Sequence, residues 1–70
     1  MRKYAVVFEP TRTGFSACIP DLPGCIATGR TLQETQERIH SAMEMHLRAM
    51  RQDGDPIPEP SHIACMLEVA

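Results

Sequence analysis

Two short runs near the N-terminus show the period-two alternation that is typical of β-strands. Residues 4–9 and 15–19 carry aromatic, β-branched and small apolar residues, with Tyr4, Val6 and Phe8 on one side of the first run. Residues 10–14, PTRTG, combine proline with a glycine that permits positive φ, as turns do. Two runs joined by such a short loop predict an antiparallel hairpin.

A second break follows at residues 20–24, PDLPG. Proline lacks a backbone N–H, so Pro20 and Pro23 cannot both lie in a central ladder. Residues 25–29 then predict a short third strand. The three strands together predict a meander of antiparallel strands.

The middle of the chain changes to the spacing of a helix. Thr31 and Glu34 have the spacing of a capping box, in which the threonine hydroxyl accepts from the glutamate N–H and the carboxylate reaches back. The helix is predicted to run to about Arg51 and to stop at Gly54. Its predicted inner face comprises Leu32, Ile39, Ala42, Met43, His46, Leu47 and Met50. The helix methionines, Met43, Met45 and Met50, either fill the core or form an adaptable binding surface.

The C-terminal part is predicted to be extended. Residues 53–61 contain Pro56, Pro58 and Pro60 and are expected to run over the surface. Residues 63–69 alternate again and predict a last strand that returns to the sheet. The order β-β-β-α-β predicts an α+β fold in a single domain of residues 1–70, one sheet with one helix packed on one face.

Charge and composition argue against several classes of function. The net charge is −2, from seven basic and nine acidic residues, with one tyrosine and no tryptophan. No basic cluster is longer than Arg2-Lys3, so direct binding of nucleic acid is disfavoured. No apolar run has the length of a membrane span, and the N-terminus does not resemble a signal peptide. We expect a cytoplasmic protein with no membrane partner.

Small size predicts self-association. A chain of 70 residues usually needs a disulfide, a metal or a partner chain to be stable. It has an odd number of cysteines, Cys18, Cys25 and Cys65, and no two of them form a CxxC pair, so reduced thiols are expected. One helix leaves one face and both edges of the sheet open, and we expect a homo-oligomer, a dimer or higher, formed by sheet contacts.

No residues are predicted to be catalytic, to ligate a metal or to bind a cofactor. Glu9 and Asp21 lack the further clustered carboxylates that two-metal phosphodiester cleavage needs. Asp21 between two prolines is expected to cap a turn. His40 and His46 are six residues apart and point in different directions from a helix. His62 and Cys65 would lie on opposite faces of a strand.

Five segments resemble the N-terminal domain of HicB antitoxins, and together they span essentially the whole chain. They are residues 4–9, GFSA at 14–17, IPDLPGC at 19–25, TGRTLQE at 28–34 and DGDPIPEP at 53–60. The resemblance implies a partial ribonuclease-H-like fold, dimers or larger oligomers, and neutralisation of HicA, a small basic mRNA endonuclease. The antitoxin would do this by covering the active-site face of the toxin.

The chain departs from that pattern in two places. Gln36 stands where small helix-packing residues are common in the family. The residues up to Ala70 include no ribbon-helix-helix or helix-turn-helix segment, so binding of operator DNA is not expected of this chain alone.

We therefore interpret the sequence as the antitoxin of a type II toxin–antitoxin pair with a HicA-like toxin. Charge and loop position, rather than the resemblance, suggest Asp21, Asp53, Asp55 and Glu59 as partner-binding residues. The alternative is an orphan oligomeric HicB-like module that binds another protein or a small ligand without catalysis. A metal-dependent nuclease is a third and remote option.

Overall fold

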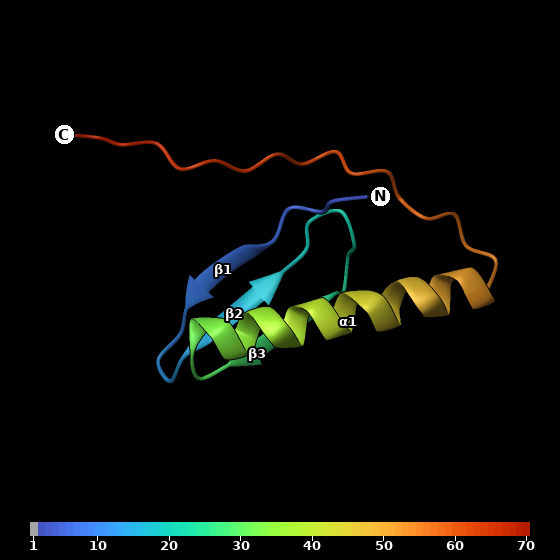
Figure 1. Ribbon diagram of the computed structural model, residues 1–70, viewed down its shortest axis with the longest axis horizontal. Helices are drawn as coiled ribbons and strands as arrows, with labels where there is room; N and C mark the ends of the chain where they lie inside the picture. Colours follow the sequence, from blue (N-terminus) through green and yellow to red (C-terminus); the bar gives the residue numbers. More distant parts are fainter. Residues whose placement is uncertain (1) are drawn as a thin grey trace.

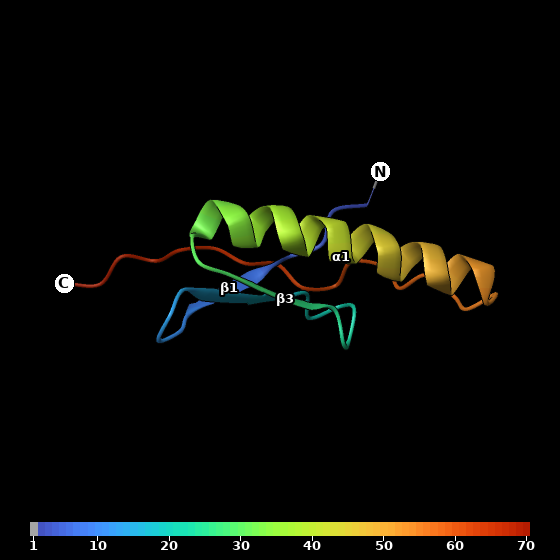
Figure 2. The same ribbon diagram turned by 90° about the horizontal axis from the view of Figure 1, so that it is seen from below.

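The computed structural model describes residues 2–70, which form one antiparallel sheet and one long helix (Figures 1 and 2). The sheet has the order β1 (Val7–Pro10), β2 (Phe15–Cys18), β3 (Ile26–Gly29). Helix α1 (Leu32–Gln52) covers one face of the sheet and packs chiefly on β3 and β2. The predicted α+β fold, with a three-stranded meander followed by one helix, is confirmed.

The strand faces are arranged as the alternation predicts. Phe8 of β1 lies opposite Ala17 of β2, which in turn lies opposite Ala27 of β3. Ala17 and Ile19 are 1% and 2% exposed, and Phe8 packs against them. The ladder is shorter than predicted, because β1 begins at Val7 and the residues before it pair with no strand within residues 2–70.

The predicted break between β2 and β3 also contributes to the core. Its turn is closed by hydrogen bonds from the N–H of Leu22 to the Ile19 carbonyl (2.9 Å) and from the N–H of Cys25 to the Leu22 carbonyl (3.0 Å). Gly24 has a φ of 87°, which glycine adopts without strain. Leu22 and Cys25 are buried by this turn, so a segment expected only to interrupt the sheet fills part of its interior.

Helix α1 begins and ends with hydrogen-bonded caps. The Thr31 hydroxyl accepts from the N–H of Glu34 (3.0 Å), as predicted, whereas the Glu34 carboxylate accepts from the N–H of Arg30 rather than from the cap itself (2.8 Å). At the other end, Gly54 has a φ of 73° and the N–H of Asp55 donates to the Met50 carbonyl (2.9 Å), which is the Schellman pattern.

Residues 63–69 do not return to the sheet, and the prediction of a fourth strand is wrong for the single chain. The segment is extended and has no ladder partner within residues 2–70. Its large side chains are almost fully exposed, with Ile63 at 97% and Leu67 at 86%. It runs along the β1 side of the sheet without joining it (Figures 1 and 2). The residues just before it, Ser61 and His62, are bonded to Asp21. The alternation of residues 63–69 does not specify which strand they pair with.

A prediction follows from the close approach of β3 to α1 at Gly29. A Cβ on Gly29 would lie 2.6 Å from Thr35 Oγ1 and 2.9 Å from the Thr35 backbone nitrogen. We expect Gly29→Ala to lower the free energy of unfolding by about 1–3 kcal/mol, because the helix must shift away from the strand. Urea denaturation measures the change. Ser41→Ala, on the exposed helix surface, is the control and should change stability by less than about 0.5 kcal/mol.

Candidate protein-binding surface

Asp21 joins the β2–β3 turn to the C-terminal segment. Its carboxylate lies against Ser61 and His62 and accepts from the Ser61 N–H (3.0 Å), the Ser61 hydroxyl (2.6 Å) and the His62 N–H (3.2 Å). His62 Nδ1 lies 2.7 Å from Asp21 Oδ1, the oxygen that also accepts from the Ser61 hydroxyl. We call Asp21 with Ser61 and His62 the Asp21 clamp.

The clamp stabilises the ionised form of Asp21. Hydrogen bonds from Ser61 and then from His62 hold the pKa of the Asp21 carboxyl well below its usual range. The Asp21 side chain is only 5% exposed. Its two oxygens are thus already engaged within the chain.

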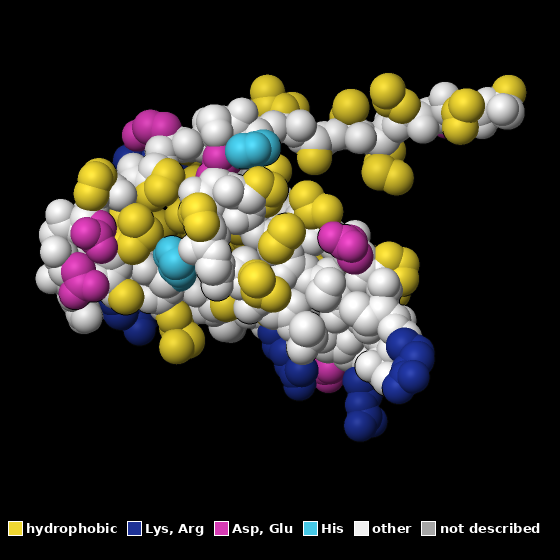
Figure 3. All heavy atoms as spheres, turned by 180° about the vertical axis from the view of Figure 1, so that it is seen from behind, with side chains coloured by type: hydrophobic (Ala, Val, Ile, Leu, Met, Phe, Trp, Pro, Cys, Tyr) yellow, Lys and Arg dark blue, Asp and Glu magenta, His cyan; other side chains and the backbone are white. Residues whose placement is uncertain are grey.

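The other three predicted partner-binding acids lie on separate stretches of the surface. Asp53 caps the C-terminus of α1 and Asp55 follows it, and both are exposed. Glu59 pairs with Arg2 at 3.0 Å, with the glutamate side chain 79% exposed. Figure 3 shows acidic side chains in separate small groups among apolar ones. Whether any of the four acids contacts a partner stays a prediction.

An apolar groove runs between the first strand and the helix. Tyr4 and Val6, which precede β1, and Phe8 of β1 line one wall, and Ile39 and Met43 line the other, around about 320 Å³. The rest of the lining is Ile19 and the polar or charged residues Arg2, Lys3, Gln36 and His40. We call these residues the β1–α1 groove. A second hollow shares its Tyr4 and Met43 end and extends it along the helix. The groove exists because α1 lies over β3 and β2 and leaves β1 at the margin.

The face of the sheet opposite the helix also carries apolar side chains. Val7, Cys18 and Ile26 lie side by side in the register of the three strands. Val7 is 40% and Ile26 63% exposed. The open sheet face expected from a single helix is therefore present, with an apolar row across it.

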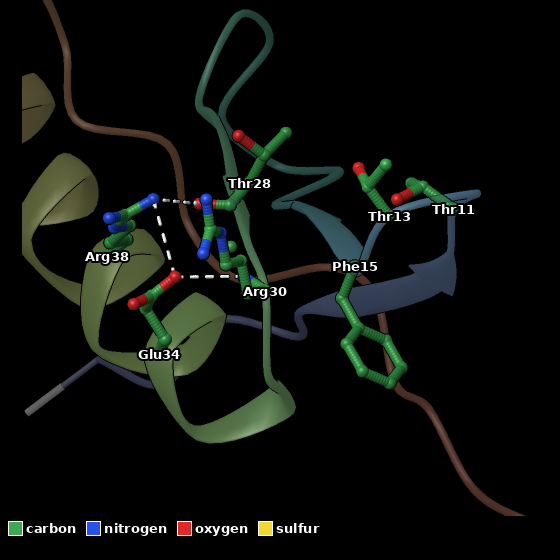
Figure 4. Close-up of a pocket in the computed structure, with 8 residues that line it drawn as sticks. Thr11, Thr13, Phe15, Thr28, Arg30, Glu34 and Arg38 are labelled. Atoms are coloured by element: carbon green, nitrogen blue, oxygen red, sulfur yellow. Dashed lines mark hydrogen bonds and ion pairs between the residues drawn. The ribbon is translucent and has the colours of Figure 1, made fainter.

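A polar depression lies at the start of α1 (Figure 4). Arg38 donates to the Thr28 carbonyl (3.0 Å) and lies 3.6 Å from Glu34, which already accepts from the Arg30 N–H. Thr11, Thr13 and Thr28 also line this depression, which has a volume of about 840 Å³. Since the one carboxylate here is bonded to arginine and backbone groups, the depression offers no free acid or base.

The histidines and cysteines do not converge. His40 pairs with Glu44 on the helix surface (3.1 Å), His46 is half-buried, and His62 belongs to the Asp21 clamp. The cysteines are all free, and burial raises the pKa of the Cys25 thiol. Across residues 2–70 no three potential metal ligands lie together. Within the same residues, no helix has the length and apolarity that a bilayer crossing requires.

An apolar groove, an open sheet face and an unpaired apolar segment are left uncovered by the single helix of this small α+β domain. Residues 4–69 match the family described as "HicB_like antitoxin of bacterial toxin-antitoxin system". The match covers almost the whole chain, so this protein belongs to the HicB-like antitoxin family.

Relatives come from a phage, an archaeon and a cyanobacterium. The chain is 30% identical over 60 residues to an uncharacterized 14.9 kDa protein of Haemophilus phage HP1, covering 86% of this chain and 45% of the phage protein. UPF0150 proteins of Archaeoglobus fulgidus and Synechocystis are 34% and 36% identical over 56 residues. These matches cover 76% and 79% of this chain and 81% and 77% of the relatives. The chain thus spans about half of the phage relative and most of the two others.

The fold is similar to that of HicB3 in a solved structure of the HicA3 and HicB3 toxin-antitoxin complex. The TM-score is 0.73 at 28% sequence identity, with 84% of this chain and 70% of the other covered. The resemblance inferred from sequence segments is confirmed by these comparisons.

Sequence reasoning missed the clamp and the groove. Asp21 was expected to act as a turn residue or a partner contact, and its bonds to Ser61 span 40 positions of sequence. The only local signal is a pair of polar residues, Ser61 and His62, at the end of the proline stretch. Thr35, fully buried and bonded to the Thr31 carbonyl (2.7 Å), was also missed because threonine does not mark an apolar face.

The clamp predicts a pH-dependent contribution to stability. The folded chain holds the Asp21 pKa below its unfolded value of about 3.9, so this contribution is complete above about pH 5 and is lost as the pH falls below that. Asp21→Asn should remove this part of the pH dependence and speed amide exchange at residues 61 and 62. Unfolding at a series of pH values and hydrogen exchange measure both effects. Glu9→Gln, an exposed carboxylate on β1, should leave both unchanged.

Proposed function

We propose that this chain is the antitoxin of a type II toxin–antitoxin pair in the cytoplasm. It binds a HicA-like mRNA endonuclease and neutralises it by covering the active-site face of the toxin. The observation that carries the proposal is the family match over residues 4–69, together with the structural similarity to HicB3 in its complex with HicA3. In this proposal the chain itself performs no catalysis and needs no cofactor.

The surface of the chain supports a binding role. The β1–α1 groove and the row of Val7, Cys18 and Ile26 offer apolar area of the kind found at interface centres. Asp53, Asp55 and Glu59 are exposed and offer negative charge to a basic toxin. The carboxylate oxygens of Asp21 are already bonded to Ser61 and His62. Asp21 would therefore influence toxin binding by holding the C-terminal segment in place rather than by contacting the toxin.

A co-expression experiment tests the proposed function. A small basic protein encoded next to this chain should arrest growth when expressed alone, and this chain should relieve the arrest and co-purify with that protein. If the chain is instead an orphan module, its co-expression should not relieve the growth arrest, and the basic protein should not co-purify with it. RNA cleavage by the purified chain with Mg²⁺, abolished in Asp21→Asn, would instead favour the nuclease option.

The exposed acidic residues lead to a second prediction, about the rate at which this chain associates with the toxin. Removing three charges in Asp53→Asn, Asp55→Asn and Glu59→Gln together should slow association with the toxin by roughly tenfold at low salt, and by less at high salt. Stopped-flow mixing over a range of salt concentrations measures the rate. A matched variant neutralises Glu9, Glu37 and Glu44, which lie on β1 and the helix surface. If both variants slow association equally, net charge alone steers the encounter and the assignment of these acids is wrong.

A further inference from the structure

The C-terminal segment, residues 63–69, is extended and pairs with no strand among residues 2–70. Its residues alternate as those of a strand do, with Ile63, Cys65, Leu67 and Val69 on one face and Ala64, Met66 and Glu68 on the other, so the first face is the more apolar. Ile63 is 97%, Leu67 86% and Val69 94% exposed. Figure 3 shows the segment leaving the body of the molecule with apolar side chains on both sides. Removing such apolar area from water stabilises any assembly in which it is buried.

Each chain also has a free sheet edge of matching character. β1 lies at one edge of the order β1-β2-β3, beside the β1–α1 groove. A strand added to this edge would direct every second side chain toward the walls formed by Phe8 and Met43, beneath the helix. The opposite edge is different, because Arg38 already donates to the Thr28 carbonyl of β3 and the depression beside it is polar. An apolar strand therefore fits the β1 edge better than the β3 edge.

The segment of the same chain does not occupy this edge. Tyr4 donates to the Pro58 carbonyl, and the Asp21 clamp holds Ser61 and His62. Beyond these anchors the segment continues past β1 and forms no ladder with it. Every copy thus presents both an unpaired extended segment and an unpaired sheet edge, and in a pair of copies related by a two-fold axis each segment can pair with the edge of the other copy.

The exposed surface area of the chain is large enough for the segment of one copy to be buried against the sheet edge of another. The chain exposes 5754 Å², whereas a compact monomer of 7.8 kDa exposes about 4,400 Å². The excess, about 1,400 Å², exceeds the roughly 800 Å² that each partner buries in an interface of standard size. A second copy can therefore cover the segment and the edge within an ordinary interface.

We propose that residues 63–69 of one copy pair with the β1 edge of a second copy and place Ile63, Cys65, Leu67 and Val69 over its β1–α1 groove. The dimer is a reciprocal exchange of C-terminal strands. Each sheet then has four strands, of which the fourth comes from the partner subunit. This inference does not depend on the antitoxin role, since it concerns the chain without any toxin.

An isotope-mixing experiment identifies the chain that supplies the strand. Carbon-13-labelled and unlabelled chains are unfolded, mixed and refolded with reducing agent, which prevents disulfides through Cys65. Isotope-filtered spectra should show contacts between the methyl groups of Leu67 or Val69 on one chain and Val6 or Phe8 on the other. The same contacts found only within one labelled chain, or found nowhere, would overturn the exchange.

Two neighbouring substitutions test the assigned face. Leu67→Asp should raise the dimer dissociation constant about 30-fold or more, because the lost burial of a leucine side chain alone corresponds to that factor. Met66→Asp is the matched control. Met66 is 97% exposed and points to the other side of the segment, so its replacement should change the constant less than threefold.

Sedimentation equilibrium over a range of protein concentrations measures the constants. Neither residue contacts the core of its own chain, so both variants keep the monomer fold and a loss of dimer is not a folding defect. A wild-type chain that stays monomeric at all concentrations, or equal effects of the two substitutions, would refute the proposal. A chain that exchanges strands yet binds no toxin would leave this inference intact and refute only the antitoxin role.

Discussion

The contact between Gly29 of β3 and Thr35 of α1 sets the geometry of the whole domain. Because Gly29 has no side chain, the first turns of the helix lie directly on the strand, and Thr35 and Ile39 are buried there. A helix seated at this position covers β3 and β2 and leaves β1 at the margin. The groove beside β1, the exposed sheet face and the free edge follow from this one close approach.

Features governed by neighbouring residues could be predicted from the sequence. The hairpin follows from alternation and the PTRTG turn, and the helix start follows from Thr31 and Glu34, since a cap needs only residues three apart. The helix stop at Gly54 is equally local. The family could also be inferred, because its segments are distributed over the full length of the chain.

Features that depend on residues far apart could not be predicted. Alternation in residues 63–69 indicates a strand but carries no information about which edge, or which chain, pairs with it. The four hydrogen bonds of Asp21 join positions 40 and 41 residues apart, and a carboxylate between two prolines suits a turn equally well. Buried Thr35 escaped notice because its hydroxyl is satisfied by the Thr31 carbonyl, a bond that hydrophobic periodicity does not register.

The proline stretch that precedes the last segment has a consequence for the cost of assembly. Pro56, Pro58 and Pro60 restrict the backbone even in the unfolded chain, and Tyr4 holds the stretch at Pro58 while Asp21 holds Ser61 just beyond it. The direction in which the chain leaves the domain is therefore set before any encounter. Residues 56–62 therefore have less conformational entropy to lose on association, which lowers the cost of assembling two such subunits.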